Sequence, residues 1–146
     1  MIGMITAIIS GVLMSIQGVF NTGVTKQTSV WVASAFVQFT ALLVCLVAWF
    51  VTGRESNFLA LFQVDHKYML LGGAIGAFIT YTVIQSVAAL GPAKSIMLIV
   101  TSQLIAAYLI ELFGLFGTQK VEFMWRKLLG LALIISGIII FKWERS

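Results

Sequence analysis

Residues 30–52 read VWVASAFVQFTALLVCLVAWFVT and contain no charged side chain. A helix needs about 20 predominantly apolar residues to cross the roughly 30 Å of hydrocarbon in a bilayer. This stretch is long enough to do so. Only helices and closed barrels satisfy their backbone groups in lipid, and the sequence lacks the alternating polarity of barrel strands. Residues 30–52 therefore predict a transmembrane helix.

Four more stretches of the sequence have a similar length and apolar character. With the first, the expected spans are residues 2–20, 30–52, 68–90, 93–116 and 127–141. The first span has no Lys or Arg before its apolar residues, unlike a secretory signal peptide, so we expect it to be retained. The sequence therefore predicts a single all-α domain over residues 1–146, a polytopic membrane protein with five transmembrane helices.

The composition of the whole chain supports this class. Of the 146 residues, 60% are hydrophobic and 10% are charged, and the mean hydropathy is +1.06. Soluble domains are about one-quarter charged, so this composition excludes a water-soluble globule. We expect the net charge of +4 to lie in loops that face lipid head groups, not in a surface that binds nucleic acid.

Basic residues are almost equally divided between the two expected sides of the membrane. With five spans, the side of the N-terminus carries Arg54, Lys67, Lys120, Arg126 and Lys127, and the other side carries Lys26, Lys94, Lys142 and Arg145. Because the side richer in Lys and Arg stays in the cytoplasm, this balance hardly sets a direction of insertion. One interpretation is a single orientation decided by a few residues. We favour insertion in both directions and an antiparallel (inverted) homodimer, since transporters commonly bind substrate between inverted repeats.

Small residues recur at helical spacing in several spans. Glycine lets helix backbones approach closely, and helix association in lipid depends on such packing. The glycines that we expect at helix contacts are Gly11, Gly18, Gly72, Gly76, Gly130 and Gly137.

Glu111 is the one acid inside an expected span, five residues before the end of residues 93–116. A charge at the bilayer centre costs about 2.5–3.5 kcal/mol, and less near the interface. Loss of water favours the protonated form of a carboxyl group, so Glu111 is a candidate proton carrier. The alternative is a partly buried glutamate that reaches the head groups or bonds a neighbouring hydroxyl.

Four amide side chains are candidates to line a path for cargo. Gln103 precedes Glu111 on much the same helix face, and Gln17 and Asn21 share a face of the first span. Gln38 lies within the second span.

Enzyme chemistry has little support in the sequence. His66 is the only histidine, no Cys/His cluster suggests a metal site, and GGAIG at residues 72–76 is a packing motif without a soluble nucleotide-binding context. We expect no enzyme activity, no metal and no cofactor.

Five segments of the sequence carry a recognisable pattern: GVLMSIQGVFNTGV (11–24), LLGGAIGAF (70–78), LGPAKS (90–95), SQLIAAYLIELFGLFG (102–117) and RKLLGLALIISGIIIF (126–141). Together they resemble the short, five-helix YdcZ-like branch of the drug/metabolite transporter superfamily. The resemblance implies a transporter module related to half of a ten-helix member, in which inverted pairs replace the fused duplicate. The family pattern often has Gly and Asp where this sequence has Ser102 and Glu111, and no defined substrate carries over.

The sequence and the resemblance together predict a small secondary transporter of the bacterial inner membrane. Glu111 would exchange a proton for a small metabolite or an organic cation, and Gln17, Asn21, Gln38 and Gln103 would line the path. The expected partners are a second, inverted copy of the chain, the lipid bilayer and the small-molecule substrate. Two alternatives remain open, a passive channel and a non-transporting accessory or scaffold subunit.

Overall fold

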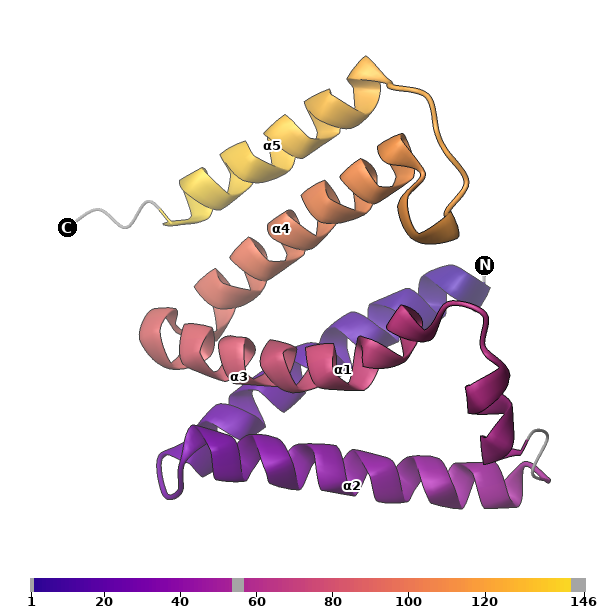
Figure 1. The fold of residues 1–146 in the computed structure, drawn as a ribbon. Coiled ribbons are helices and arrows are strands. Elements are labelled where there is room, and N and C mark those ends of the chain that lie inside the picture. Colours follow the sequence, from indigo (N-terminus) through magenta and orange to yellow (C-terminus); the bar gives the residue numbers. More distant parts are fainter. Residues whose placement is uncertain (1, 54–56, 143–146) are drawn as a thin grey trace. The chain divides into compact units, whose positions relative to one another are not determined.

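The computed structural model describes residues 2–53 and 57–142, and this part of the chain consists of helices joined by loops (Figure 1). The predicted all-α class is confirmed. The α-helices are α1 (Ile2–Thr25), α2 (Val30–Val51), α3 (Gly72–Leu90), α4 (Pro92–Phe113) and α5 (Trp125–Lys142). Three short 3₁₀ helices join them, η1 (Phe58–Gln63), η2 (Lys67–Leu71) and η3 (Leu115–Gly117). Arg54 and Arg145, which entered the charge balance above, lie outside the described residues.

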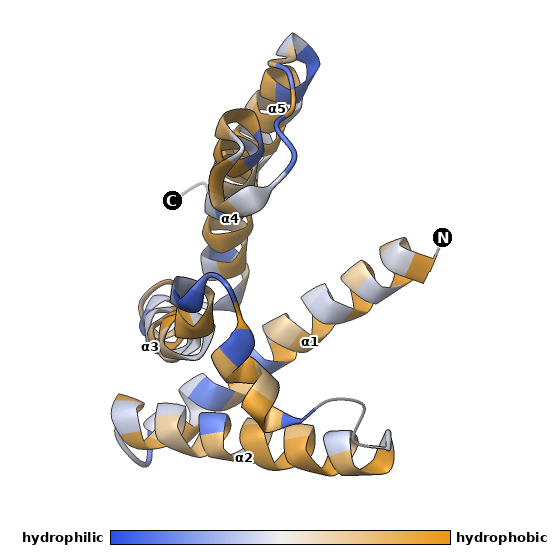
Figure 2. Cartoon of the chain, turned by 45° about the vertical axis from the view of Figure 1, so that its right-hand side comes forward, coloured by the Kyte–Doolittle hydropathy of each residue, from blue (hydrophilic) through white to orange (hydrophobic). Residues whose placement is uncertain are grey.

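Four helical stretches within the described residues are long and apolar enough to cross a membrane. They are Ile2–Thr25, Val30–Val51, Lys67–Leu90 and Pro92–Phe113. Figure 2 shows apolar residues along the whole length of α2, and Val44 and Val47 on it are 68% and 64% exposed. Such surfaces suit contact with lipid chains and not with water. α5 has 18 residues and carries Arg126 and Lys127 near its start, so the structure does not establish a fifth span.

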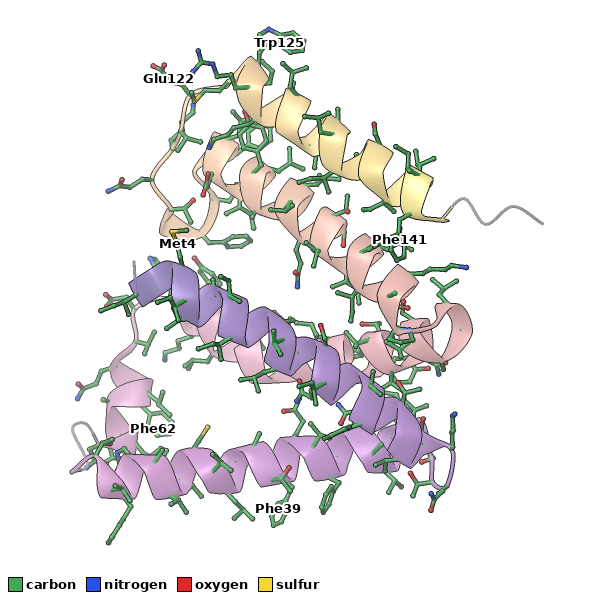
Figure 3. The ribbon with its side chains drawn as sticks, turned by 180° about the vertical axis from the view of Figure 1, so that it is seen from behind. Met4, Phe39, Phe62, Glu122, Trp125 and Phe141 are labelled. Atoms are coloured by element: carbon green, nitrogen blue, oxygen red, sulfur yellow. The ribbon has the colours of Figure 1, made fainter. Side chains whose placement is uncertain are left out.

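The chain divides into two compact units, Met1–Ala89 and Leu90–Ser146. In the first unit, α1 packs against α2. Ser29 starts α2, because its side chain accepts a hydrogen bond from the Val32 N–H at 3.2 Å and so caps the helix. Phe39 projects from α2 on the side away from α1 and α3 and is 56% exposed (Figure 3).

Two of the predicted packing glycines have close neighbours in the first unit. A Cβ atom at Gly18 would lie 3.5 Å from Val83 of α3, and one at Gly76 would lie 3.6 Å from the Gln38 amide of α2. At the other four glycines, a Cβ atom would meet no described atom of a neighbouring helix within 4 Å, so their packing role stays a prediction. These four are Gly11, Gly72, Gly130 and Gly137.

In the second unit, α4 and α5 run side by side in opposite directions (Figure 1). α4 starts with Pro92, whose missing N–H costs nothing at the first helical position. It ends at Phe113 because Gly114 turns the backbone into the left-handed region, with φ 64°. The sequence predicts a span as far as residue 116, so Glu111 lies closer to the helix end than expected.

Candidate functional site

Glu111 forms an ion pair with Lys127 in the second unit. Glu111 lies in the last turn of α4 and Lys127 in the first turn of α5. The Lys127 Nζ donates a hydrogen bond to the Glu111 Oε2 at 3.3 Å. Within the isolated chain, the Glu111 side chain is 49% exposed and the Lys127 side chain is 41% exposed. The sequence reasoning considered head groups or a hydroxyl as partners for Glu111 and missed the lysine.

Tyr108 is the third polar residue of this site. It lies one helical turn before Glu111, and the Lys127 Nζ is 5.0 Å from the centre of its ring. A cation at this distance is attracted by the negative face of an aromatic ring. The Lys127 ammonium therefore has two partners on α4, a carboxylate and an aromatic ring.

The loop between α4 and α5 brings Lys127 opposite Glu111. The Val121 N–H donates to the Glu111 backbone carbonyl at 3.0 Å, and the Met124 N–H donates to the Tyr108 hydroxyl at 3.2 Å. The Thr118 hydroxyl donates to the carbonyl of Ile110 at 3.3 Å. The last carbonyls of a helix have no partner inside the helix, so the bonds to the carbonyls of Glu111 and Ile110 satisfy two of them, and all three bonds fix the loop on the end of α4.

A cavity of about 310 Å³ opens beside the ion pair, between α4 and α5. Glu111, Lys127 and Tyr108 supply its charged and polar side chains. The other walls are apolar or small, and they come from Leu104, Ala107, Gly130, Leu131 and Ile134. Ligand sites are typically concave and mostly apolar, with a few polar groups that fix orientation. This cavity has that composition.

The predicted amide residues are distributed over different places. Gln17 and Asn21 line a second cavity, of about 710 Å³, between α1 and α2 of the first unit, and Asn21 is only 8% exposed. Gln38 instead donates a hydrogen bond to the Thr80 hydroxyl of α3 at 3.4 Å. Gln103 is exposed on α4 and lines neither cavity. The structure thus brings Gln17 together with Asn21, whereas Gln38 and Gln103 line neither of these two cavities.

The described residues, 2–53 and 57–142, contain no group of three or more His, Cys, Asp or Glu side chains that could hold a metal ion. The charged chemistry of the candidate site therefore consists of one carboxylate and one ammonium group. The carboxylate can accept a proton or a cationic group, and the ammonium can pair with an anionic group.

Long apolar helices and a small cavity with a carboxylate define a helical membrane protein with a candidate binding site. Residues 2–140 match a family model, DMT_YdcZ, described as "Putative inner membrane exporter, YdcZ". The chain belongs to this family, and the resemblance found in the sequence is confirmed. The match and the apolar helices identify a membrane-embedded protein of a transporter family. No curated protein and no solved structure matches the chain.

Proposed function

We propose that the protein is a small secondary transporter of the bacterial inner membrane that exchanges protons for a small metabolite or an organic cation. The observation that supports this most directly is the position of Glu111, whose carboxylate lines a cavity between two helices. An acid inside a membrane-spanning segment is costly and is kept mainly where it handles ions or substrate. Protonation and cargo binding would compete for this one carboxylate.

The proposal includes a fifth span formed by α5. Its 18 residues extend about 27 Å at about 1.5 Å per residue, close to one hydrocarbon thickness. Arg126 near its start would extend its charged end to the head groups while its stem lies along apolar surface, whereas Lys127 is paired with Glu111. With five spans, the two ends of the chain lie on opposite sides of the membrane.

The proposal also includes an inverted homodimer. The nearly balanced basic residues support it, because they give little preference for one orientation. With five spans, Glu111 lies toward the N-terminal side of the membrane, whereas Gln17 and Asn21 lie toward the opposite side. Inversion of one copy would bring these depths together. Glu111 of one chain would then face the level of Asn21 of the partner subunit.

Proton coupling is tested with the purified protein in liposomes that contain a pH-sensitive dye. The cargo probe is a mixture of the free amino acids that occur in proteins, together with tetramethylammonium. We expect the mixture to drive proton movement through the wild-type protein, and Glu111→Gln to reduce it to the level of protein-free liposomes. The matched control is Glu122→Gln, because Glu122 projects from the loop away from α4 and α5 (Figure 3).

Three outcomes would contradict the proposal. Cargo uptake, followed with labelled probe in the same liposomes, that Glu111→Gln leaves unchanged indicates a passive channel, because a channel needs no carboxylate to carry protons. Absence of any cargo or proton movement in the wild type indicates an accessory or scaffold subunit. Equal losses in Glu111→Gln and Glu122→Gln would show that the effect does not come from the cavity.

A further inference from the structure

We infer that the cavity between α4 and α5 binds a small zwitterion with an apolar side chain, an apolar α-amino acid, with its ammonium at Glu111 and its carboxylate at Lys127. This inference rests on the proposed transport function and narrows the class of cargo. It depends on the Glu111–Lys127 ion pair, which the sequence alone did not predict.

The first step is that Lys127 already occupies the place of a bound cation. Its ammonium contacts the carboxylate of Glu111 at 3.3 Å and lies 5.0 Å from the centre of the Tyr108 ring. A carboxylate and an aromatic face are the groups that recognise an ammonium ligand. A cationic group of the cargo that takes this place, between the Glu111 Oε2 and the Tyr108 ring, must therefore displace the Lys127 ammonium from it.

The second step concerns the charge that remains after this displacement. A simple cation would take the carboxylate of Glu111 and leave the ammonium of Lys127 without a counter-charge beside an apolar cavity, which is unfavourable. A zwitterion supplies a partner for both groups, since its ammonium pairs with Glu111 and its carboxylate pairs with Lys127. The site stays electrically neutral before and after binding.

The third step is that the site allows this exchange. Lys127 has a flexible four-carbon stem and is 41% exposed, so its ammonium can move without unfolding α5. The remaining walls, including Leu104, Leu131 and Ile134, suit an apolar side chain. The volume of about 310 Å³ is at the lower end of ordinary ligand sites, which suits a small molecule.

The test compares three probes that share one side chain but differ in net charge. They are L-leucine, a zwitterion, L-leucinamide, a cation, and N-acetyl-L-leucine, an anion. Binding to the full-length protein in dodecyl maltoside micelles is measured by titration. We expect the wild type to bind leucine about ten-fold more tightly than either analogue, because only leucine pairs both charges. In Lys127→Gln, we expect leucinamide to become the preferred probe.

Arg126→Gln is the matched control, because it removes a neighbouring positive charge from the same turn of α5 without changing a residue that lines the cavity. Arg126→Gln should keep the preference for leucine. Lys127→Arg should show most of the preference that Lys127→Gln loses. A wild-type preference for leucinamide, an unchanged preference in Lys127→Gln, or absence of binding of all three probes would overturn the inference.

Two further arms separate this inference from its alternatives. Phosphatidylethanolamine also carries an ammonium and an anionic group, so the titration is repeated with this lipid in the micelles. Full competition by the lipid, together with loss of leucine transport in liposomes, would assign the site to a head group and overturn the inference. Proton movement that survives unchanged in Glu111→Gln liposomes would contradict the proposed function alone, since it does not involve the order of the three probes.

Discussion

Tyr108 has two separate roles at the residue scale. Its ring lies under the Lys127 ammonium, and its hydroxyl accepts a hydrogen bond from the Met124 N–H at 3.2 Å. The first contact belongs to the cavity, and the second fixes the loop before α5. Because only the hydroxyl oxygen holds the loop, a substitution that removes this atom and keeps the ring separates the two roles.

We expect Tyr108→Phe to loosen the loop while keeping the ring under Lys127. Loss of one intramolecular hydrogen bond should lower the free energy of unfolding by about 1 kcal/mol. Hydrogen exchange at the Met124 amide should become faster, because the amide loses its partner. Thermal unfolding in micelles and hydrogen exchange measure the two effects. Tyr108→Leu is the comparison, since it removes the ring as well and should also weaken leucine binding. Unchanged exchange at Met124 would contradict this assignment.

The ion pair shows what sequence reasoning finds at this scale and what it misses. Glu111 stood out because an acid inside an apolar stretch is rare. Lys127 was expected only as the first residue of the span 127–141 and as a basic charge on the N-terminal side of the membrane, and the level that it shares with Glu111 follows from the helix ends that the structure shows. Glu111 lies shortly before the end of one helix, and Lys127 lies equally shortly after the start of the next. In an antiparallel pair, these positions share one level. Which way each side chain points depends on helix rotation, which the sequence did not give.

At the scale of elements, the end of α4 decides where Glu111 lies. Gly114 has φ 64°, in the left-handed region, and Phe116 has φ 56°, which is uncommon for a residue other than glycine. Glycine just after a helix is a usual stop signal. The expected span continued to residue 116 because Leu115 and Phe116 are apolar. The stop at Gly114 could therefore be predicted from the FGLFG sequence, whereas the folding of the loop onto Tyr108 and Glu111 could not.

We expect glycine to be the favoured residue at both positions, because both have a positive φ. Gly114→Ala should lower the free energy of unfolding by about 1–2 kcal/mol, because an L-residue pays for the left-handed conformation. The added Cβ would also lie only 3.3 Å from the Cβ of Lys120. Phe116→Gly relieves the same kind of strain and should cost less than Phe116→Ala. Thermal unfolding in micelles ranks these variants. Equal stability of Gly114→Ala and the wild type would show that the turn is not the constraint.

At the scale of the whole molecule, two features concern what surrounds the helices. The exposed apolar surface must be covered by lipid or by a second copy of the chain, and the balance of basic residues affects how such a copy is oriented. Large apolar side chains on α1 and α2, such as Ile8, Val44 and Val47, are more than half exposed in the isolated chain. Lipid or a second copy would cover them. The sequence alone accounts for the apolar helices, since length and hydropathy suffice. It cannot supply the arrangement of two copies, because contacts between copies depend on shape as well as on apolar character.

The charge balance gives the prediction that tests the proposed inverted pair. Gln119→Arg with Lys26→Gln would place six basic residues on the N-terminal side and three on the other, and Lys67→Gln with Lys120→Gln and Gln27→Arg would place three and five. Because the richer side stays in the cytoplasm, each variant should insert in one direction, opposite to the other. We expect each variant alone to lose proton-coupled transport and the two expressed together to recover it. Accessibility of a terminal tag from each face of intact cells measures the orientation independently. Full activity of either variant in a single verified orientation would show that the working unit does not need an inverted copy.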